Sequence, residues 1–158
     1  MRIFTEGKIE VERRIAARPE TVFSYFTDPE RFVRWQGVDA ELDPRPGGLF
    51  RVTVSGKSHL AVRGEYVEVN PPTRLVFTWG WEPSDGLPKG LFGLNPGTST
   101  VEVDLVPDGQ DTILRLRHSG LPTDANRKAH TDAWAVTLKR LGICATGGDP
   151  GPNPFEDL

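Results

Sequence analysis

The sequence predicts an α+β protein, in which a curved antiparallel sheet of about seven strands packs against one long C-terminal helix. From residue 38 to residue 118, apolar residues recur at every second position in segment after segment, which is typical of strands with one buried face. Over residues 123–142 the spacing changes to three and four, which is typical of a helix. Two short helices are expected after the first strand.

The chain begins with an alternating strand over residues 8–16, whose apolar side also carries Arg13. Pro19 suits the first position of a short helix, because its ring fixes φ and the missing N–H is not needed there. Asp28 ends that helix and opens a second one, which runs to Trp35. These elements precede the main part of the sheet.

Residues that favour turns divide the next part of the chain into further strands. Gly64 lies within one of these segments and indicates a bulge or a bend. The motif P-D-G-Q-D joins the last two segments as a hairpin. The expected strands are 38–42, 50–54, 59–69, 74–82, 99–106 and 112–118.

The long helix has signals at both ends. Thr123 is a suitable N-cap, and Gly142 offers a left-handed exit residue. Lys139 and Arg140 suit the negative end of the helix dipole. One face carries the residues expected to turn inward, which are Asn126, His130, Trp134, Leu138 and Leu141.

Two segments fit neither pattern. Residues 83–98 form a long loop that is rich in glycine and proline, and loops of this length often act as lids or binding loops. Residues 143–158 are also rich in glycine and proline, so an extended or disordered tail is expected. Residues 1–142 are therefore predicted to form a single domain.

The composition excludes several classes of protein. Hydrophobic residues make up 37% and charged residues 26%, and the net charge of −3 gives no sign of a nucleic-acid partner. No apolar run approaches the roughly 20 residues that span a bilayer. The single cysteine, Cys144, cannot form an internal disulfide. These features and the charged N-terminus, which lacks a signal-peptide core, predict a cytoplasmic protein.

The space between the sheet and the long helix is the expected site. Large aromatic side chains there can stack against a ligand, or they can simply fill the core. The candidate ligand-binding residues are Trp35, Phe50, Phe77, Trp79, Trp81, His118, His130, Trp134 and Leu138.

His118 and His130 are expected on the inward faces of the last strand and of the helix. A neutral histidine there can orient a ligand oxygen or act as a base. We favour local hydrogen bonding, because a base needs a partner group that the sequence does not specify. No catalytic residue, metal site or cofactor is assigned.

Several motifs carry a resemblance to a known superfamily. They are A-A-R-P-E-T-V-F at 16–23, D-P-E-R-F-V-R-W at 28–35, P-P-T-R-L-V-F-T-W at 71–79 and H-S-G-L-P at 118–122. In this order they resemble the START-related helix-grip superfamily, also called SRPBCC, in its branch related to the activator of the heat-shock-protein-90 ATPase. The resemblance covers residues 8–142 and departs at Ala133, where the family usually has glycine.

The resemblance implies an apolar cavity that holds a lipid, a sterol or a polyketide-like molecule. Our leading hypothesis is a non-catalytic carrier or sensor of a small hydrophobic ligand. A cyclase or dehydratase that uses His118 or His130 as a base is the first alternative. An interaction domain linked to a chaperone is the second, and the sequence also leaves a homodimer open.

Overall fold

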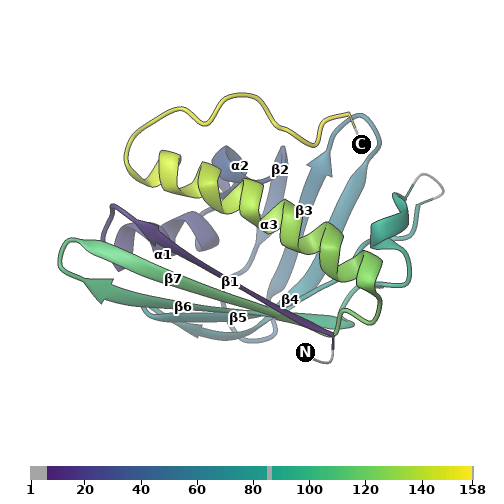
Figure 1. Cartoon of the computed structure of the whole chain (residues 1–158), viewed down its shortest axis with the longest axis horizontal. Coiled ribbons are helices and arrows are strands. Elements are labelled where there is room, and N and C mark those ends of the chain that lie inside the picture. Colours follow the sequence, from purple (N-terminus) through teal and green to yellow (C-terminus); the bar gives the residue numbers. More distant parts are fainter. Residues whose placement is uncertain (1–6, 85–86, 158) are drawn as a thin grey trace.

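The computed structural model describes residues 7–84 and 87–157, and these residues form seven antiparallel strands in one sheet. The order across the sheet is β1-β7-β6-β5-β4-β3-β2, so the first two strands of the chain lie at opposite edges (Figure 1). The predicted fold class is confirmed. The strands are β1 (Lys8–Ile15), β2 (Asp39–Leu42), β3 (Leu49–Ser55), β4 (Leu60–Asn70), β5 (Arg74–Trp79), β6 (Ser99–Asp108) and β7 (Asp111–Ser119).

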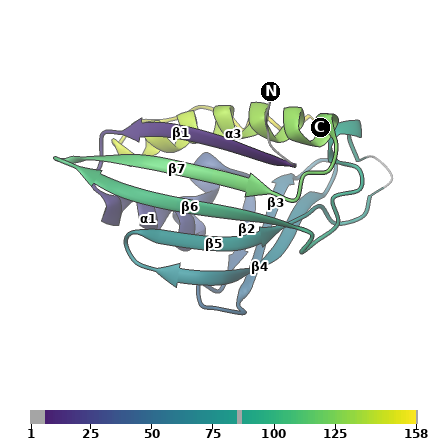
Figure 2. The same ribbon diagram turned by 60° about the horizontal axis from the view of Figure 1, so that its bottom comes forward.

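The helices lie on one side of this sheet, as Figures 1 and 2 show. Two short helices, α1 (Pro19–Thr27) and α2 (Pro29–Trp35), carry the chain from one edge to the other. The long helix α3 (Asp124–Ala145) lies across the same face, and a short 3₁₀ helix, η1 (Lys89–Leu91), precedes β6. None of the helices in the described part of the chain is long and apolar enough to cross a membrane.

The alternating pattern identified the inner face of the last hairpin correctly. The antiparallel register places Val101 opposite His118 and Leu105 opposite Leu114. Period-two alternation puts every second side chain on the same face, so these residues point together toward α3. The residues of this inner face are all buried, namely Val101, Val103, Leu105, Leu114, Leu116 and His118.

The inner face and the N-cap of the long helix were also predicted correctly. The Thr123 side chain accepts a hydrogen bond from the backbone N–H of Asn126 at 3.0 Å, which satisfies one of the free donors of the first turn. The predicted inward residues Asn126, His130, Trp134, Leu138 and Leu141 are all buried. The helix therefore packs through the face that its spacing indicated.

The predicted end of this helix was wrong. The helix continues past Gly142 to Ala145, and Gly147 adopts the left-handed conformation with φ of 89°. Tertiary contacts explain the extra turn, because Cys144 is buried and its carbonyl accepts a hydrogen bond from the Tyr25 hydroxyl at 3.1 Å. A boundary drawn at residue 142 thus falls inside the helix.

The expected strand 74–82 is shorter than its pattern indicated. β5 ends at Trp79, and Trp81 forms only an isolated bridge with Val62. The backbone N–H of Trp81 donates instead to the carbonyl of Leu94 at 2.6 Å, so the following loop returns against it. Trp81 nevertheless stays buried.

The described part of the C-terminal tail beyond α3 has no regular secondary structure, and hydrogen bonds hold it against the domain. Arg140, which the sequence assigned to the helix dipole, is buried and serves as the anchor. Its guanidinium donates to the carbonyls of Pro150 at 3.1 Å and Pro152 at 2.9 Å. Asn153 donates to the carbonyl of Val54 at 2.8 Å. That residues 1–142 are a separate unit stays a prediction.

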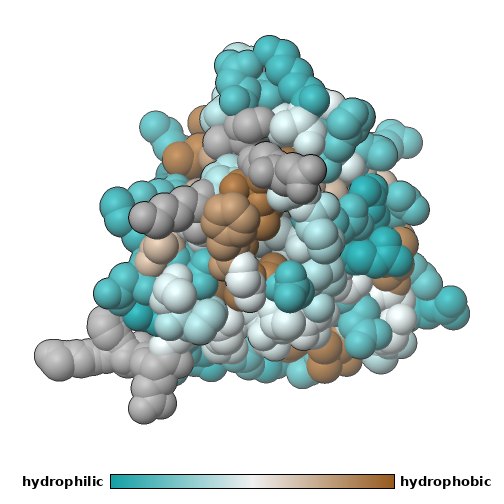
Figure 3. All heavy atoms as spheres, turned by 90° about the vertical axis from the view of Figure 1, so that its right-hand side faces the viewer, coloured by the Kyte–Doolittle hydropathy of each residue, from teal (hydrophilic) through white to brown (hydrophobic). Residues whose placement is uncertain are grey.

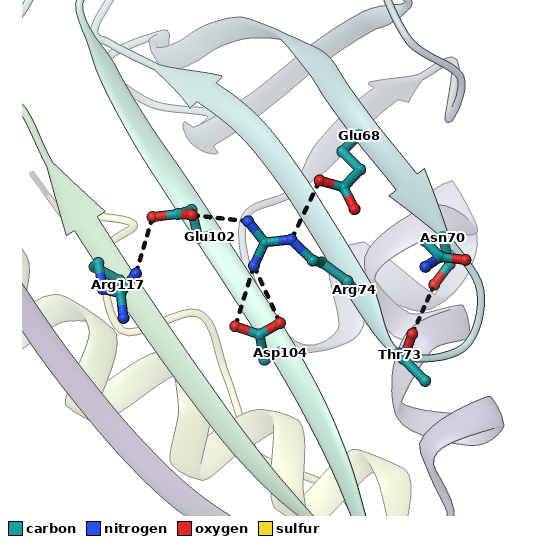
Figure 4. Close-up of polar contacts among 7 residues, drawn as sticks. All are labelled: Glu68, Asn70, Thr73, Arg74, Glu102, Asp104 and Arg117. Atoms are coloured by element: carbon teal, nitrogen blue, oxygen red, sulfur yellow. Dashed lines mark hydrogen bonds and ion pairs between the residues drawn. The ribbon is translucent and has the colours of Figure 1, made fainter.

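The outer face of the sheet carries paired charges, which Figure 4 shows around Arg74. This guanidinium contacts Glu102 at 2.8 Å, Asp104 at 3.1 Å and Glu68 at 3.2 Å. Hydrogen bonding to Arg74 lowers the pKa of the Glu102 carboxyl. The acidic residues around Arg74 therefore form ion pairs on a solvated surface.

Replacing Gly64 with alanine is expected to lower the free energy of unfolding by about 1–3 kcal/mol, the usual cost of overpacking. A Cβ at Gly64 would lie 2.0 Å from the backbone oxygen of Thr78, so one strand must shift. Urea unfolding measures the change. Gly56→Ala is the control, because its Cβ would meet nothing closer than 3.4 Å. Equal stabilities of the two variants would contradict the close approach of β4 and β5.

Candidate functional site

A cavity of about 270 Å³ lies between α3, η1, the C-terminal tail and the inner face of β3 and β5. Its wall is almost entirely apolar, and Asp132 is its one charged residue among the described lining residues. The lining residues are Gln36, Val54, Trp79, Trp81, Pro88, Gly90, Leu91, Ala129, His130, Asp132, Ala133, Trp134, Val136, Thr137 and Phe155. Figure 3 shows the end of the molecule beside η1 and the C-terminus, where hydrophobic side chains gather at the centre of a mostly polar face.

Four of the candidate residues line this cavity, namely Trp79, Trp81, His130 and Trp134. The rings of Trp79 and Trp134 are 5.0 Å apart between centroids, and Trp79 meets Trp81 edge to face at 6.0 Å. The three indoles therefore form one continuous aromatic wall, to which a strand, a loop and a helix each contribute. Whether these residues hold a ligand stays a prediction.

The other five candidates lie outside the cavity wall. Phe50 and Phe77 stack on each other at 4.2 Å in the core, and Leu138 is fully buried. The Trp35 indole donates to the carbonyl of Tyr25 at 2.8 Å. His118 lies behind the wall. These side chains support the site from within the core, and the alternation could not separate them from residues that reach the cavity.

His118 is fixed by hydrogen bonds on both ring nitrogens. The Trp134 indole donates to His118 Nδ1 at 3.1 Å. Because an indole N–H only donates, Nδ1 carries the lone pair and the proton is on Nε2. Nε2 lies 2.9 Å from Ser99 Oγ, to which it donates, and the Ser99 hydroxyl donates to the carbonyl of Trp79 at 2.6 Å.

His130 has the opposite tautomer. The Trp81 indole donates to His130 Nε2 at 3.1 Å, so this nitrogen carries the lone pair. The proton is on Nδ1, which donates to the backbone carbonyl of Asn126 at 2.7 Å. The local hydrogen bonding that we favoured from the sequence is thus present for both histidines.

Burial keeps both imidazoles neutral. It lowers the pKa of His118 well below the usual histidine value, and the neighbouring His130 lowers it further. Burial also lowers the pKa of His130. The two rings lie 5.1 Å apart between centroids, and their lone pairs already accept from indoles. Neither ring offers a free basic nitrogen to a molecule in the cavity.

The sequence pattern missed several residues of the wall. Thr137 is buried and lies three residues after Trp134, so helical spacing contained a signal for it. Val54 belongs to the alternating apolar face of β3. Gln36, Leu91 and Phe155 lie in irregular segments or at an element's end, where periodicity carries no information. Their place depends on tertiary packing.

The outer face of the sheet carries a depression of a different kind. It has a volume of about 520 Å³ and is lined largely by charged residues. These include Glu12 and Arg115, which pair with each other at 2.9 Å, and Arg117, which pairs with Glu102 at 3.4 Å. Within residues 7–84 and 87–157, no three histidine, cysteine, aspartate or glutamate side chains cluster as metal ligands.

The family described as "Activator of Hsp90 ATPase homolog 1-like protein" matches residues 16–145, which include all three α-helices and most of the sheet. The chain belongs to this family. The match begins directly after β1 and ends with the last residue of α3. The predicted resemblance is therefore confirmed.

Solved structures with a similar fold agree with this assignment. The AHSA1-like protein of Rhizobium etli is 42% identical, with a TM-score of 0.67 over 96% of this chain and 90% of that one. CalU16 of Micromonospora echinospora is 28% identical, with a TM-score of 0.70 over 95% and 71%. An HSP90 activator of Plasmodium falciparum shares the fold at 21% identity, with a TM-score of 0.67 over 89% and 96%. No curated protein matches the chain.

Stability is expected to fall as the pH drops below about 6.5, the usual pKa of histidine in an unfolded chain. Both pKa values are lowered in the folded state, so the unfolded chain binds more protons below that pH. Each histidine then contributes a loss of up to about 1.4 kcal/mol per pH unit, until the pH reaches its folded pKa. Urea unfolding between pH 7.5 and 5 measures the slope.

The variant His118→Gln with His130→Gln is expected to flatten this slope. His59→Asn is the matched control, because His59 is exposed and asparagine tolerates its left-handed backbone. A slope that survives in the double variant would show that other groups are responsible.

Proposed function

We propose that the chain binds a small hydrophobic molecule in the cavity between α3 and the sheet, and that it acts as a non-catalytic carrier or sensor. The observation that carries this proposal is the apolar cavity with three tryptophans in one wall. Aromatic walls bind flat apolar molecules through stacking and edge contacts. A volume of about 270 Å³ is at the small end of ligand pockets, which suits a compound of two or three rings or a short acyl chain.

Two irregular segments complete the proposed pocket. The Asn126 side chain holds the loop before β6 by donating to the carbonyls of Gly90 at 2.8 Å and Phe92 at 3.1 Å. Phe155 closes another side from the docked tail. We propose that ligand entry requires one of these segments to move. The loop would then serve as the lid that its length and composition predicted.

Native mass spectrometry of the purified protein, followed by solvent extraction, tests the function directly. The expected result is a discrete additional mass of a few hundred daltons, which corresponds to a pocket of this size. A chain that carries nothing, and that also binds no member of a panel of fatty acids, sterols and aromatic polyketides, would overturn the proposal.

Ala133→Leu is expected to weaken ligand binding at least tenfold, because the larger side chain would fill the cavity from α3. Ala133 is the lining residue at which this chain departs from the glycine usual in the family. Ala135→Leu is the matched control, because Ala135 is exposed on the same helix and does not line the cavity. Isothermal titration calorimetry with the extracted ligand measures both. Equal affinities would place the ligand elsewhere.

The cyclase or dehydratase alternative requires a histidine that removes a proton from the substrate. The indole hydrogen bonds to His118 and His130 do not support this role, because they occupy both lone pairs. We therefore expect the ligand to be recovered chemically unchanged after incubation with the protein. Loss of water from the ligand, abolished by His130→Gln, would favour the enzyme instead. Mass spectrometry of the recovered compound decides between them.

The chaperone-linked alternative depends on the family description and not on a surface of this chain. Among the described residues, the large exposed hydrophobic side chains lie on separate segments of the chain. They are Val38, Val67, Phe92, Val106 and Val136. Protein interfaces of this kind normally need a contiguous apolar area of several hundred Å².

A further inference from the structure

Two polar atoms without partners belong to side chains in the cavity wall. Trp79 Nε1 and Gln36 Oε1 are buried and form no hydrogen bond, and both side chains line the apolar cavity. Trp79 is 3% exposed and Gln36 is 7% exposed. Within the described part of the chain, the other unpartnered buried side-chain atoms are on Arg13 and Asn126, which do not line the cavity.

The unpaired indole stands out because the other two indoles of the same wall are paired. Trp81 donates to His130 and Trp134 donates to His118, each at 3.1 Å. The Trp79 carbonyl accepts from Ser99, yet its ring N–H has no acceptor. Buried polar groups are normally hydrogen-bonded, so an unpaired one next to a cavity favours a ligand that supplies the missing partner.

Gln36 adds a second polar group of a different kind. It follows α2, and its backbone N–H donates to the carbonyl of Phe32 at 3.0 Å, so its backbone position is fixed. Its side-chain amide has an acceptor oxygen and a donor nitrogen, whereas the indole of Trp79 can only donate. A ligand oxygen can therefore accept from the Trp79 indole, and a ligand hydroxyl can donate to Gln36 Oε1.

We propose that Trp79 and Gln36 select a hydroxylated ring compound over a pure hydrocarbon of the same size. This inference rests on the proposed function, since it describes the ligand of the same cavity. The three indoles supply the apolar contact area, and the two unpartnered atoms supply the specificity for a polar oxygen. Burial from water strengthens such hydrogen bonds, because water does not compete for the same atoms.

The test compares 2-naphthol with 2-methylnaphthalene by isothermal titration calorimetry. The two probes have nearly the same size and shape, and they differ in a hydroxyl against a methyl group. The quantity of interest is the ratio of their dissociation constants. We expect Trp79→Phe and Gln36→Leu each to reduce the preference for naphthol about tenfold, the effect of one hydrogen bond. Both substitutions also change the apolar contact with the ring system, but this change affects the two probes alike and therefore cancels in the ratio.

Trp35→Phe is the matched control variant. Its indole is equally buried, but it donates to Tyr25 and lies outside the cavity wall. This substitution is expected to lower stability and to leave the ratio unchanged. Gln36→Leu removes an oxygen that has no partner, so it is expected to fold without a comparable loss.

The outcomes separate this inference from the proposed function. If both probes bind the unmodified chain and the ratio is the same in Trp79→Phe and Gln36→Leu, the selection by a hydroxyl group is overturned while the cavity remains a binding site. If neither probe binds the unmodified chain at millimolar concentration, the apolar binding function itself fails, together with this inference. A preference that drops in both variants and persists in Trp35→Phe supports the proposal.

Discussion

The geometry of the site depends on two hydrogen bonds between indole and imidazole rings that connect α3 to the rest of the inner wall. In one, the helix supplies the histidine, since His130 accepts from Trp81. In the other, the helix supplies the tryptophan, since Trp134 donates to His118 on β7. Because an indole can only donate, each bond also selects the tautomer of its histidine and disfavours the charged form. Four large polar side chains are thereby buried without a net charge, and the helix is fixed in position over the sheet.

The same helix organises the irregular segments around the cavity through buried polar side chains near its two ends. Asn126 holds the loop before β6, and Arg140 holds the tail. Arg140 also donates to the carbonyl of Trp35 at 3.2 Å, so it links the tail to the end of α2. Segments rich in glycine and proline cannot satisfy their own carbonyl groups by regular pairing. Side-chain donors from a rigid helix perform this function and place Phe155 and Gly90 in the cavity wall.

The distribution of polar groups separates the two faces of the sheet. On the outer face, Arg74 and its carboxylate partners remain partly hydrated, so their pairing adds little stability and needs no special environment. On the inner face, every buried polar group requires a defined partner. Ser99 illustrates this constraint, because its hydroxyl joins His118 to the carbonyl of Trp79 within the core. Trp79 Nε1 and Gln36 Oε1 are exceptions to this constraint, and both belong to side chains that line the cavity.

The sequence by itself determined the fold class, the inner faces of the strands and of α3, and the N-cap at Thr123. These features follow from period-two and helical spacing and from local capping chemistry, which act over a few residues. Only the tertiary structure decided that α3 continues past Gly142, that β5 stops before Trp81 and that Arg140 captures the tail. It also decided which inward residues reach the cavity, because Phe77 and Trp79 share one face of one strand, yet only Trp79 lines it. Contacts between distant segments control these outcomes, and no local pattern in the chain encodes them.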